Sequence, residues 1–129
     1  MIKCKKSTIR LIENDILFIN IAEKQEFCID DYQELLFSSM KLTQNRRVFN
    51  LINLGNQTIP DSEAREACAR NISRLNCVKA EAIVVHSLGQ RIVARDILRE
   101  KRKYMPVKLF TDLEKAKKWL EQIKSEQIN

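Results

Sequence analysis

The chain has 129 residues, 44% of them hydrophobic and 31% charged, which is the composition of a globular domain and excludes a disordered or fibrous chain. A chain of this length folds around one core, so residues 1–129 are expected to form a single domain. Lysine and arginine outnumber aspartate and glutamate by 23 to 17, a net charge of +6, which raises the question of nucleic acid or acidic lipid as a partner.

The chain begins with the pattern of a β-hairpin. Residues 8–13 (TIRLIE) alternate and contain β-branched side chains, and residues 16–22 (ILFINIA) resume the apolar run. Between them, Asn14 and Asp15 form a two-residue turn pair. Two such runs joined by a turn pair predict an N-terminal hairpin.

A helix is predicted after the hairpin. Asp30 and Asp31 supply an N-cap and a negative charge that favours a helix start, and the helix is expected to run to about Gln44. One side of this helix carries Tyr32, Leu35, Leu36, Ser39 and Met40.

Further along, short β-rich runs alternate with helical periods. Strands are predicted at residues 47–54 (RVFNLINL), 80–86 (AEAIVVH) and 106–111 (PVKLFT). The middle one of these has a near-continuous apolar centre, which is typical of a strand buried on both faces of a sheet.

Each of these three strands is followed by a predicted helix. The first opens at Pro60, Asp61 and Ser62, and its apolar positions are Ala64, Ala67, Cys68, Ile72 and Leu75. The second covers residues 89–103, with inward positions at Ile92, Val93, Ile97 and Leu98. The third is capped by Asp112, and its core positions, the tryptophan included, are Leu113, Ala116, Trp119, Leu120 and Ile123.

The predicted order is β-β-α-β-α-β-α-β-α, an α/β fold with a mixed, mostly parallel sheet and right-handed crossovers. That order resembles the STAS domain, named for sulfate transporters and anti-sigma-factor antagonists, over nearly the whole chain. Residues 80–120 (AEAIVVHSLGQRIVARDILREKRKYMPVKLFTDLEKAKKWL) are similar to the C-terminal half of small bacterial STAS-like proteins that are mostly uncharacterised. The resemblance implies a SpoIIAA-like fold and a regulatory role.

In regulatory members of that family, a helix start carries an Asp-Ser-Ser-Gly-type motif whose serine is phosphorylated by a partner kinase. The corresponding stretch here is NLGNQTIPDSEAREA, in which Asp61 and Ser62 match the first two positions, while Glu63 and Ala64 replace the second serine and the glycine. Ser62 is therefore the candidate switch residue, with Asp61 beside it. The helix dipole favours a phosphate there, the flanking carboxylates oppose it, and plain N-capping is the alternative interpretation.

Ligands of parallel sheets gather at the carboxyl ends of the strands, where the following helices present their N-termini. The candidate anion or small-ligand residues at these ends are His86, Ser87, Gly89, Arg91, Asn53 and Thr111, with Gly55 and Asp112 beside them. Backbone amides at a helix start, together with Arg91, could receive an anion. A single glycine before a helix is nevertheless far from a P-loop.

No catalytic residue, metal or cofactor is predicted. His86 and Ser87 are neighbours in a strand and point to opposite faces, and nothing supplies the orienting acid or oxyanion hole of a hydrolase. The four cysteines have no C-x-x-C spacing and His86 is the single histidine, which argues against a zinc site. Free thiols and the lack of a signal peptide or membrane span predict a cytoplasmic protein without membrane insertion.

Three functions are weighed. The first is a non-catalytic STAS-like regulatory or protein-interaction module, for which a homodimer is also possible. The second is a small-ligand binding protein, for a lipid or a nucleotide or other anion, that uses the carboxyl-end edge of the sheet. The third is nucleic-acid binding through a basic stripe at helical spacing, Arg91, Arg95, Arg99 and Arg102. Acidic residues interrupt that stripe and no aromatics interleave with it, so a solvated helix face is favoured over a nucleic-acid partner.

Overall fold

The structure is a computed structural model that describes residues 1–71 and 77–128. Within these residues the main sheet has the spatial order β1-β2-β3-β5-β7-β8, with β1 (Ile2–Lys3), β2 (Ser7–Ile12), β3 (Ile16–Ile21), β5 (Val48–Asn53), β7 (Val78–Val84) and β8 (Val107–Phe110). Two short strands, β4 (Glu26–Phe27) and β6 (Ile59–Pro60), pair separately. The helices are α1 (Ile29–Thr43), α2 (Ser62–Arg70), α4 (Leu88–Lys101) and α5 (Leu113–Ile128).

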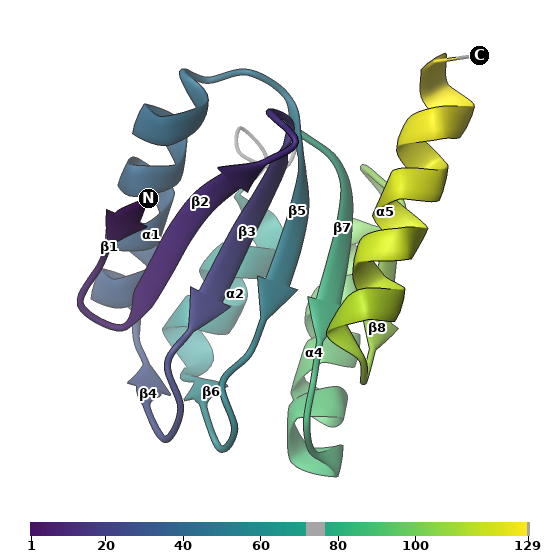
Figure 1. Cartoon of the computed structure of the whole chain (residues 1–129). Coiled ribbons are helices and arrows are strands. Elements are labelled where there is room, and N and C mark those ends of the chain that lie inside the picture. The colour runs from purple at the N-terminus through teal and green to yellow at the C-terminus, as the bar shows by residue number, and fades with distance from the viewer. Residues whose placement is uncertain (72–76, 129) are drawn as a thin grey trace.

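The sheet is mixed, as predicted. Strands β1, β2 and β3 pair antiparallel, whereas β3, β5, β7 and β8 are parallel to one another. The hairpin turn comprises Glu13, Asn14 and Asp15, one residue more than the predicted pair, and Glu13 and Asn14 adopt positive φ angles of 55° and 68°. Figure 1 shows the carboxyl ends of β3, β5 and β7 side by side at one edge of the sheet.

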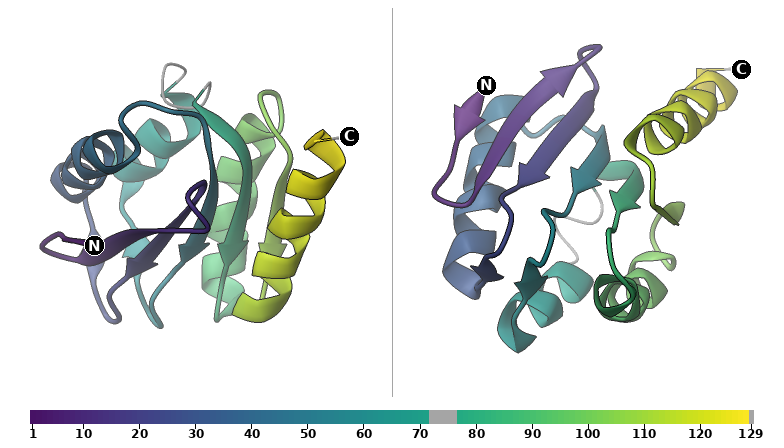
Figure 2. Two further views of the ribbon diagram at one scale, coloured as in Figure 1. Left: turned by 45° about the horizontal axis from the view of Figure 1, so that its top comes forward. Right: turned by 60° about the horizontal axis from the view of Figure 1, so that its bottom comes forward.

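The helices cover the two faces of the sheet unequally. Helices α1, α2 and α4 lie on one face and α5 lies on the other (Figures 1 and 2). Alternation along β5 divides its side chains accordingly, since successive strand residues point to opposite faces. Phe49 and Leu51 are buried in the same cluster as Leu120 of α5, while Asn50 and Ile52 line the space beneath the other three helices.

The predicted order of the long elements is confirmed, and the fold is α/β with a mostly parallel central sheet. The two-residue strands β1, β4 and β6 were not predicted, because they are too short to show a period. Trp119 is half-buried and packs on Phe110 with ring centroids 5.7 Å apart. The predicted inward positions Ile72 and Leu75 lie outside the described residues.

Two predictions about helix residues are wrong. The N-cap of α1 is Cys28, and Asp31 is the third helical residue, whose carboxylate accepts a hydrogen bond from the Cys28 backbone N–H at 2.9 Å. Ile92 does not face inward, because 54% of it is exposed. On α4 the buried positions are Gln90, Ala94, Leu98 and Lys101, and their spacing of three to four residues sets the inner face one position away from Ile92.

Candidate functional site

The carboxyl-end edge of the sheet carries a row of polar side chains from three adjacent parallel strands. Asn53 of β5 donates a hydrogen bond from Nδ2 to Asn20 Oδ1 of β3 at 2.8 Å. His86, just beyond β7, lies with its Nε2 at 2.9 Å from Asn53 Oδ1. Because that oxygen can only accept, His86 Nε2 carries the proton in this arrangement. Asn20 was not predicted, although it ends the neighbouring strand in the same way.

The start of α4 is locked to the loop that follows β5. Ser87 caps the helix, with its Oγ accepting from the Gln90 backbone N–H at 3.1 Å. The Gln90 side chain is 1% exposed and donates to the carbonyl oxygens of Gly55 and Thr58 at 2.8 and 2.9 Å. Its Oε1 accepts from the His86 backbone N–H at 2.8 Å. Gln90 was missed because a glutamine in a helix pattern normally indicates a solvated position.

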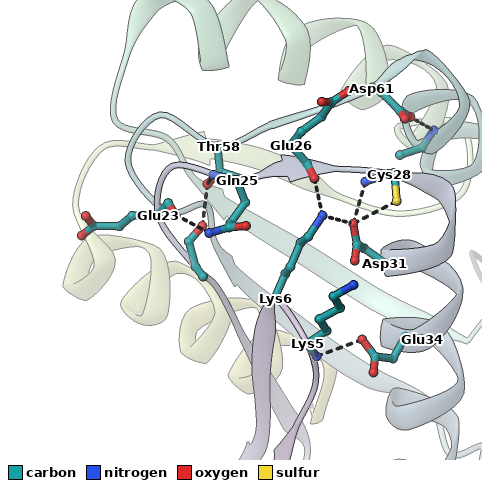
Figure 3. A network of polar contacts seen from close by, with 12 residues as sticks. Lys5, Lys6, Glu23, Gln25, Glu26, Cys28, Asp31, Glu34, Thr58 and Asp61 are labelled. Carbon is teal, nitrogen blue, oxygen red and sulfur yellow. Dashed lines mark hydrogen bonds and ion pairs between the residues drawn. The ribbon is translucent and has the colours of Figure 1, made fainter.

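A second polar network fixes the start of α1 at the same edge (Figure 3). Lys6 Nζ donates to the Glu26 carbonyl oxygen at 2.7 Å and to Asp31 Oδ2 at 2.8 Å. Burial tends to raise the pKa of the Asp31 carboxyl, but the hydrogen bonds from Lys6 and Cys28 outweigh it and hold that pKa below its usual value. At this edge, hydrogen bonds therefore connect the starts of α1 and α4 to neighbouring loops.

The candidate switch residues begin α2. Asp61 is the N-cap, and its Oδ1 accepts from the Ala64 backbone N–H at 2.9 Å, a contact drawn in Figure 3. Ser62 is the first residue of the helix and its side chain is exposed. The capping function of Asp61 is thus present, and the Ser62 hydroxyl is open to solvent.

The other predicted site residues are only partly brought together. His86 and Asn53 are in contact, and Ser87 is occupied as a helix cap. Gly89 and Thr111 are exposed and Arg91 is half-buried. In the described part of the chain no hydrogen bond joins the side chains of Arg91 or Thr111 to His86. Of the basic stripe, Arg95, Arg99 and Arg102 are exposed.

A cavity of about 120 Å³ lies on the face of the sheet that α1, α2 and α4 cover. Its walls are mostly aliphatic and come from β3, β5 and β7 on one side and from the three helices on the other. The sequence did not predict it, because it forms between elements that are distant in the chain.

Three polar side chains meet in the wall of this cavity. Lys101 Nζ lies 2.6 Å from Glu81 Oε2, and Asn50 Nδ2 donates to Glu81 Oε1 at 3.1 Å. Burial tends to lower the pKa of Lys101, but the Glu81 carboxylate raises it above its ordinary value, so the ammonium stays charged. Lys101 lies within the strongly charged sequence 99–103 (REKRK), yet it is only 8% exposed.

One buried polar atom of this group has no partner. Asn50 is 6% exposed, and its Oδ1 accepts no hydrogen bond from any described residue. Buried acceptors normally have a partner in protein or ordered water. The cavity wall therefore presents one open acceptor amid apolar surface.

Two further observations concern metals and membranes. Among residues 1–71 and 77–128, no three His, Cys, Asp or Glu side chains lie close enough together to hold a metal ion. None of the helices in this part of the chain is long and apolar enough to span a bilayer.

The chain is an α/β protein with a SpoIIAA-like fold. Residues 10–124 match the family described as "domain of unknown function (DUF7793)", and the chain belongs to that family. Among solved structures it is similar to an uncharacterized protein of the DUF3478 family with a SpoIIAA-like fold from Shewanella loihica PV-4. The two share 18% identity with a TM-score of 0.61, over 93% of this chain and 98% of the other. No curated protein matches the sequence.

The likeness to the Shewanella structure confirms the STAS-like fold that the element order predicted. At 18% identity the likeness shows the fold alone, so function has to be argued from the surface and interior of this chain.

Proposed function

We propose that this chain is a non-catalytic module that binds another protein at the carboxyl-end edge of its sheet. The observation that carries the proposal is a group of exposed apolar side chains at this edge. Leu88 and Ile92, on the first turns of α4, are 72% and 54% exposed, and Ile59 on β6 is 38% exposed. We call these three residues the edge patch.

Hydrogen bonds of the buried Gln90 side chain support the edge patch from below. Gln90 lies between Leu88 and Ile92, and its side chain donates a hydrogen bond to the carbonyl oxygen of Thr58, the residue before Ile59. This hydrogen bond connects the α4 part of the patch to its β6 part. Exposed apolar groups rimmed by polar residues are typical of protein interaction sites. Pre-organised side chains lose little entropy when a partner docks, which favours binding.

The arrangement of His86 supports a role without catalysis. Its Nε2 lies 2.9 Å from the Asn53 amide oxygen, whereas the histidine of a catalytic triad is oriented by a carboxylate and contacts a nucleophile. In the described part of the chain no hydrogen bond joins Ser62 to His86. Ser62 is an exposed residue at the start of α2.

The resemblance to regulatory STAS domains supports a role for Ser62 as the switch of this interaction. Its side chain is exposed at the first residue of α2, where the helix dipole favours negative charge. A phosphate would add a charge of about −1.5 to −2 at pH 7. Because α2 and the edge patch share one edge of the sheet, that charge would disfavour an apolar contact across the patch.

The test is quantitative capture of partners from native cell extract by the full chain, read by mass spectrometry. Leu88→Glu and Ser62→Asp should each lower recovery of the same partner at least tenfold. Phe37→Glu on α1, where Phe37 is 75% exposed, is the matched control for a charge on an apolar surface residue, and Ser62→Ala is the control for the serine.

Recovery that falls with Leu88→Glu and persists with Phe37→Glu supports the proposal. Equal recovery by all variants, or a partner lost only with Phe37→Glu, would overturn it and move the interface to another surface.

A further inference from the structure

We propose that the cavity beneath α1, α2 and α4 binds a small, neutral, mainly apolar molecule that donates one hydrogen bond to Asn50 Oδ1. The cavity shares Ile59 with the edge patch, whereas Leu88 and Ile92 do not line it, and its ligand does not depend on a protein partner. Three features of the cavity support this ligand: its volume, its open acceptor and its lack of net charge.

The volume sets the size of the ligand. The cavity has about 120 Å³, and engineered apolar cavities of ~150 Å³ stay dry and take up benzene. Aliphatic side chains such as Ile52 of β5 and Val93 and Ile97 of α4 form its walls. A molecule of about one aromatic ring therefore fits, and a bulky lipid or a nucleotide does not.

The open acceptor determines which polar group the ligand carries. The amide of Asn50 cannot be turned around, because its Nδ2 donates to Glu81 Oε1 at 3.1 Å and the reversed amide would place two acceptor oxygens together. Asn50 Oδ1 thus faces a wall that offers it no donor among the described residues. A ligand that carries an O–H or N–H group satisfies this atom.

The charges already present exclude a charged ligand. Glu81 and Lys101 form a closed pair at 2.6 Å, so the polar end of the cavity has no net charge to offer. Burial also raises the pKa of the Cys68 thiol to about 11, so this cavity residue is uncharged at pH 7. An ion in such surroundings would lack a counter-charge and stay in water.

Phenol is the probe that combines these features, since it is ring-sized, is neutral at pH 7 and has one hydroxyl donor. Titrations of the isotope-labelled full chain, followed by NMR, should show saturable binding of phenol at least tenfold tighter than that of benzene. Shifts should be concentrated at the Asn50 side-chain amide and at Ile52 and Val93. Benzoate, which has the same ring and a negative charge, should not shift these signals.

Two variants locate the site. Val93→Phe fills the cavity and should abolish phenol binding. Ile92→Phe is the matched control, because Ile92 is the adjacent residue on the same helix and is 54% exposed. Asn50→Leu removes the acceptor and should equalise the affinities for phenol and benzene. The shift map of the unmodified chain tests the site independently should a variant fail to fold.

Saturable phenol shifts at Asn50 that disappear in Val93→Phe support the site. The proposal is overturned by phenol shifts that map to Leu88 and Ile92 in place of the cavity, by equal binding of benzoate, or by the absence of any saturable shift, which would mean that the cavity holds only water. Since no partner protein is used, failure here leaves the proposed protein interaction untouched.

Discussion

Two lysines near the end of α4 show how burial changes the value of an ion pair. Lys101 meets Glu81 at 2.6 Å with side chains 10% and 2% exposed, and Lys103 meets Glu100 at 3.0 Å with side chains 63% and 33% exposed. An exposed pair contributes little because water already solvates both ions. A buried pair contributes little net stability, but removing one partner strands the other charge.

Lys101→Met is accordingly expected to lower the free energy of unfolding by about 3–5 kcal/mol, while Lys103→Met leaves it essentially unchanged. The double variant Glu81→Leu with Lys101→Met should recover most of the loss, because no charge is then stranded. Urea unfolding of the variants measures all three values. Similar effects of the two single lysine variants would show that water reaches Glu81.

A second prediction at the residue scale concerns Cys68. Burial raises the pKa of its thiol to about 11, so very little thiolate, the reactive form, exists at pH 8. Iodoacetamide should label Cys68 many times more slowly in the folded chain than in the same chain unfolded in urea. Peptide mass spectrometry follows the rate, and equal rates in the two states would contradict the raised pKa of this thiol.

At the scale of the elements, Gly55 is needed where the loop after β5 passes the end of β3. A Cβ atom at residue 55 would overlap the backbone of Ile21 and Ala22, whereas one at Gly89, in the first turn of α4, would find Ser87 Oγ at 3.9 Å as its nearest neighbour. The first glycine is required by close approach of two backbones. The second has space for a side chain.

The two alanine substitutions should therefore have opposite signs. Gly55→Ala is expected to destabilise the chain by about 1–3 kcal/mol, the typical cost of overpacking. Gly89→Ala is expected to stabilise it by up to ~1 kcal/mol through helix propensity. Melting temperatures of the two variants are the measurement, and a stabilising Gly55→Ala would show that the loop moves away from Ala22.

The length of an element decided whether the sequence could predict it. Long elements such as β5 and α5 appear in the sequence as runs with a clear period. Strands β4 and β6 instead form because residues 26–27 pair with residues 59–60, which are distant in the sequence. The start of α1 was misassigned for a related reason. Asp31 looks like an N-cap locally, but its carboxylate serves both Cys28 and the distant Lys6.

For the whole molecule, these buried charges predict how stability varies with pH. The folded pKa of Asp31 lies below its unfolded value of about 3.9, so its contribution is present above that pH and is lost as the pH falls through the folded pKa. The folded pKa of Lys101 lies above its unfolded value of about 10.4, so its contribution is present below that pH and is lost as the pH rises through the folded pKa.

The urea midpoint of unfolding is thus expected to be flat around neutral pH and to fall in both acid and strong alkali. Asp31→Asn should flatten part of the acid limb and leave the alkaline limb as it was. The double variant Glu81→Leu with Lys101→Met, which strands no charge, should flatten part of the alkaline limb. Limbs that keep their slopes in both variants would assign the pH dependence to other groups.

The sequence by itself determined the order of the long strands and helices, and through it the SpoIIAA-like fold, because hydrophobic period and helix-start residues are local properties of the chain. It also placed His86 and Asn53 at a common edge, since parallel strands end together. Only the tertiary structure decided that Asn50, Glu81 and Lys101 meet beside a cavity and that Ile92 faces solvent. Burial and pairing arise from contacts between segments 20 or more residues apart, as for Glu81 and Lys101, and no local pattern records such contacts.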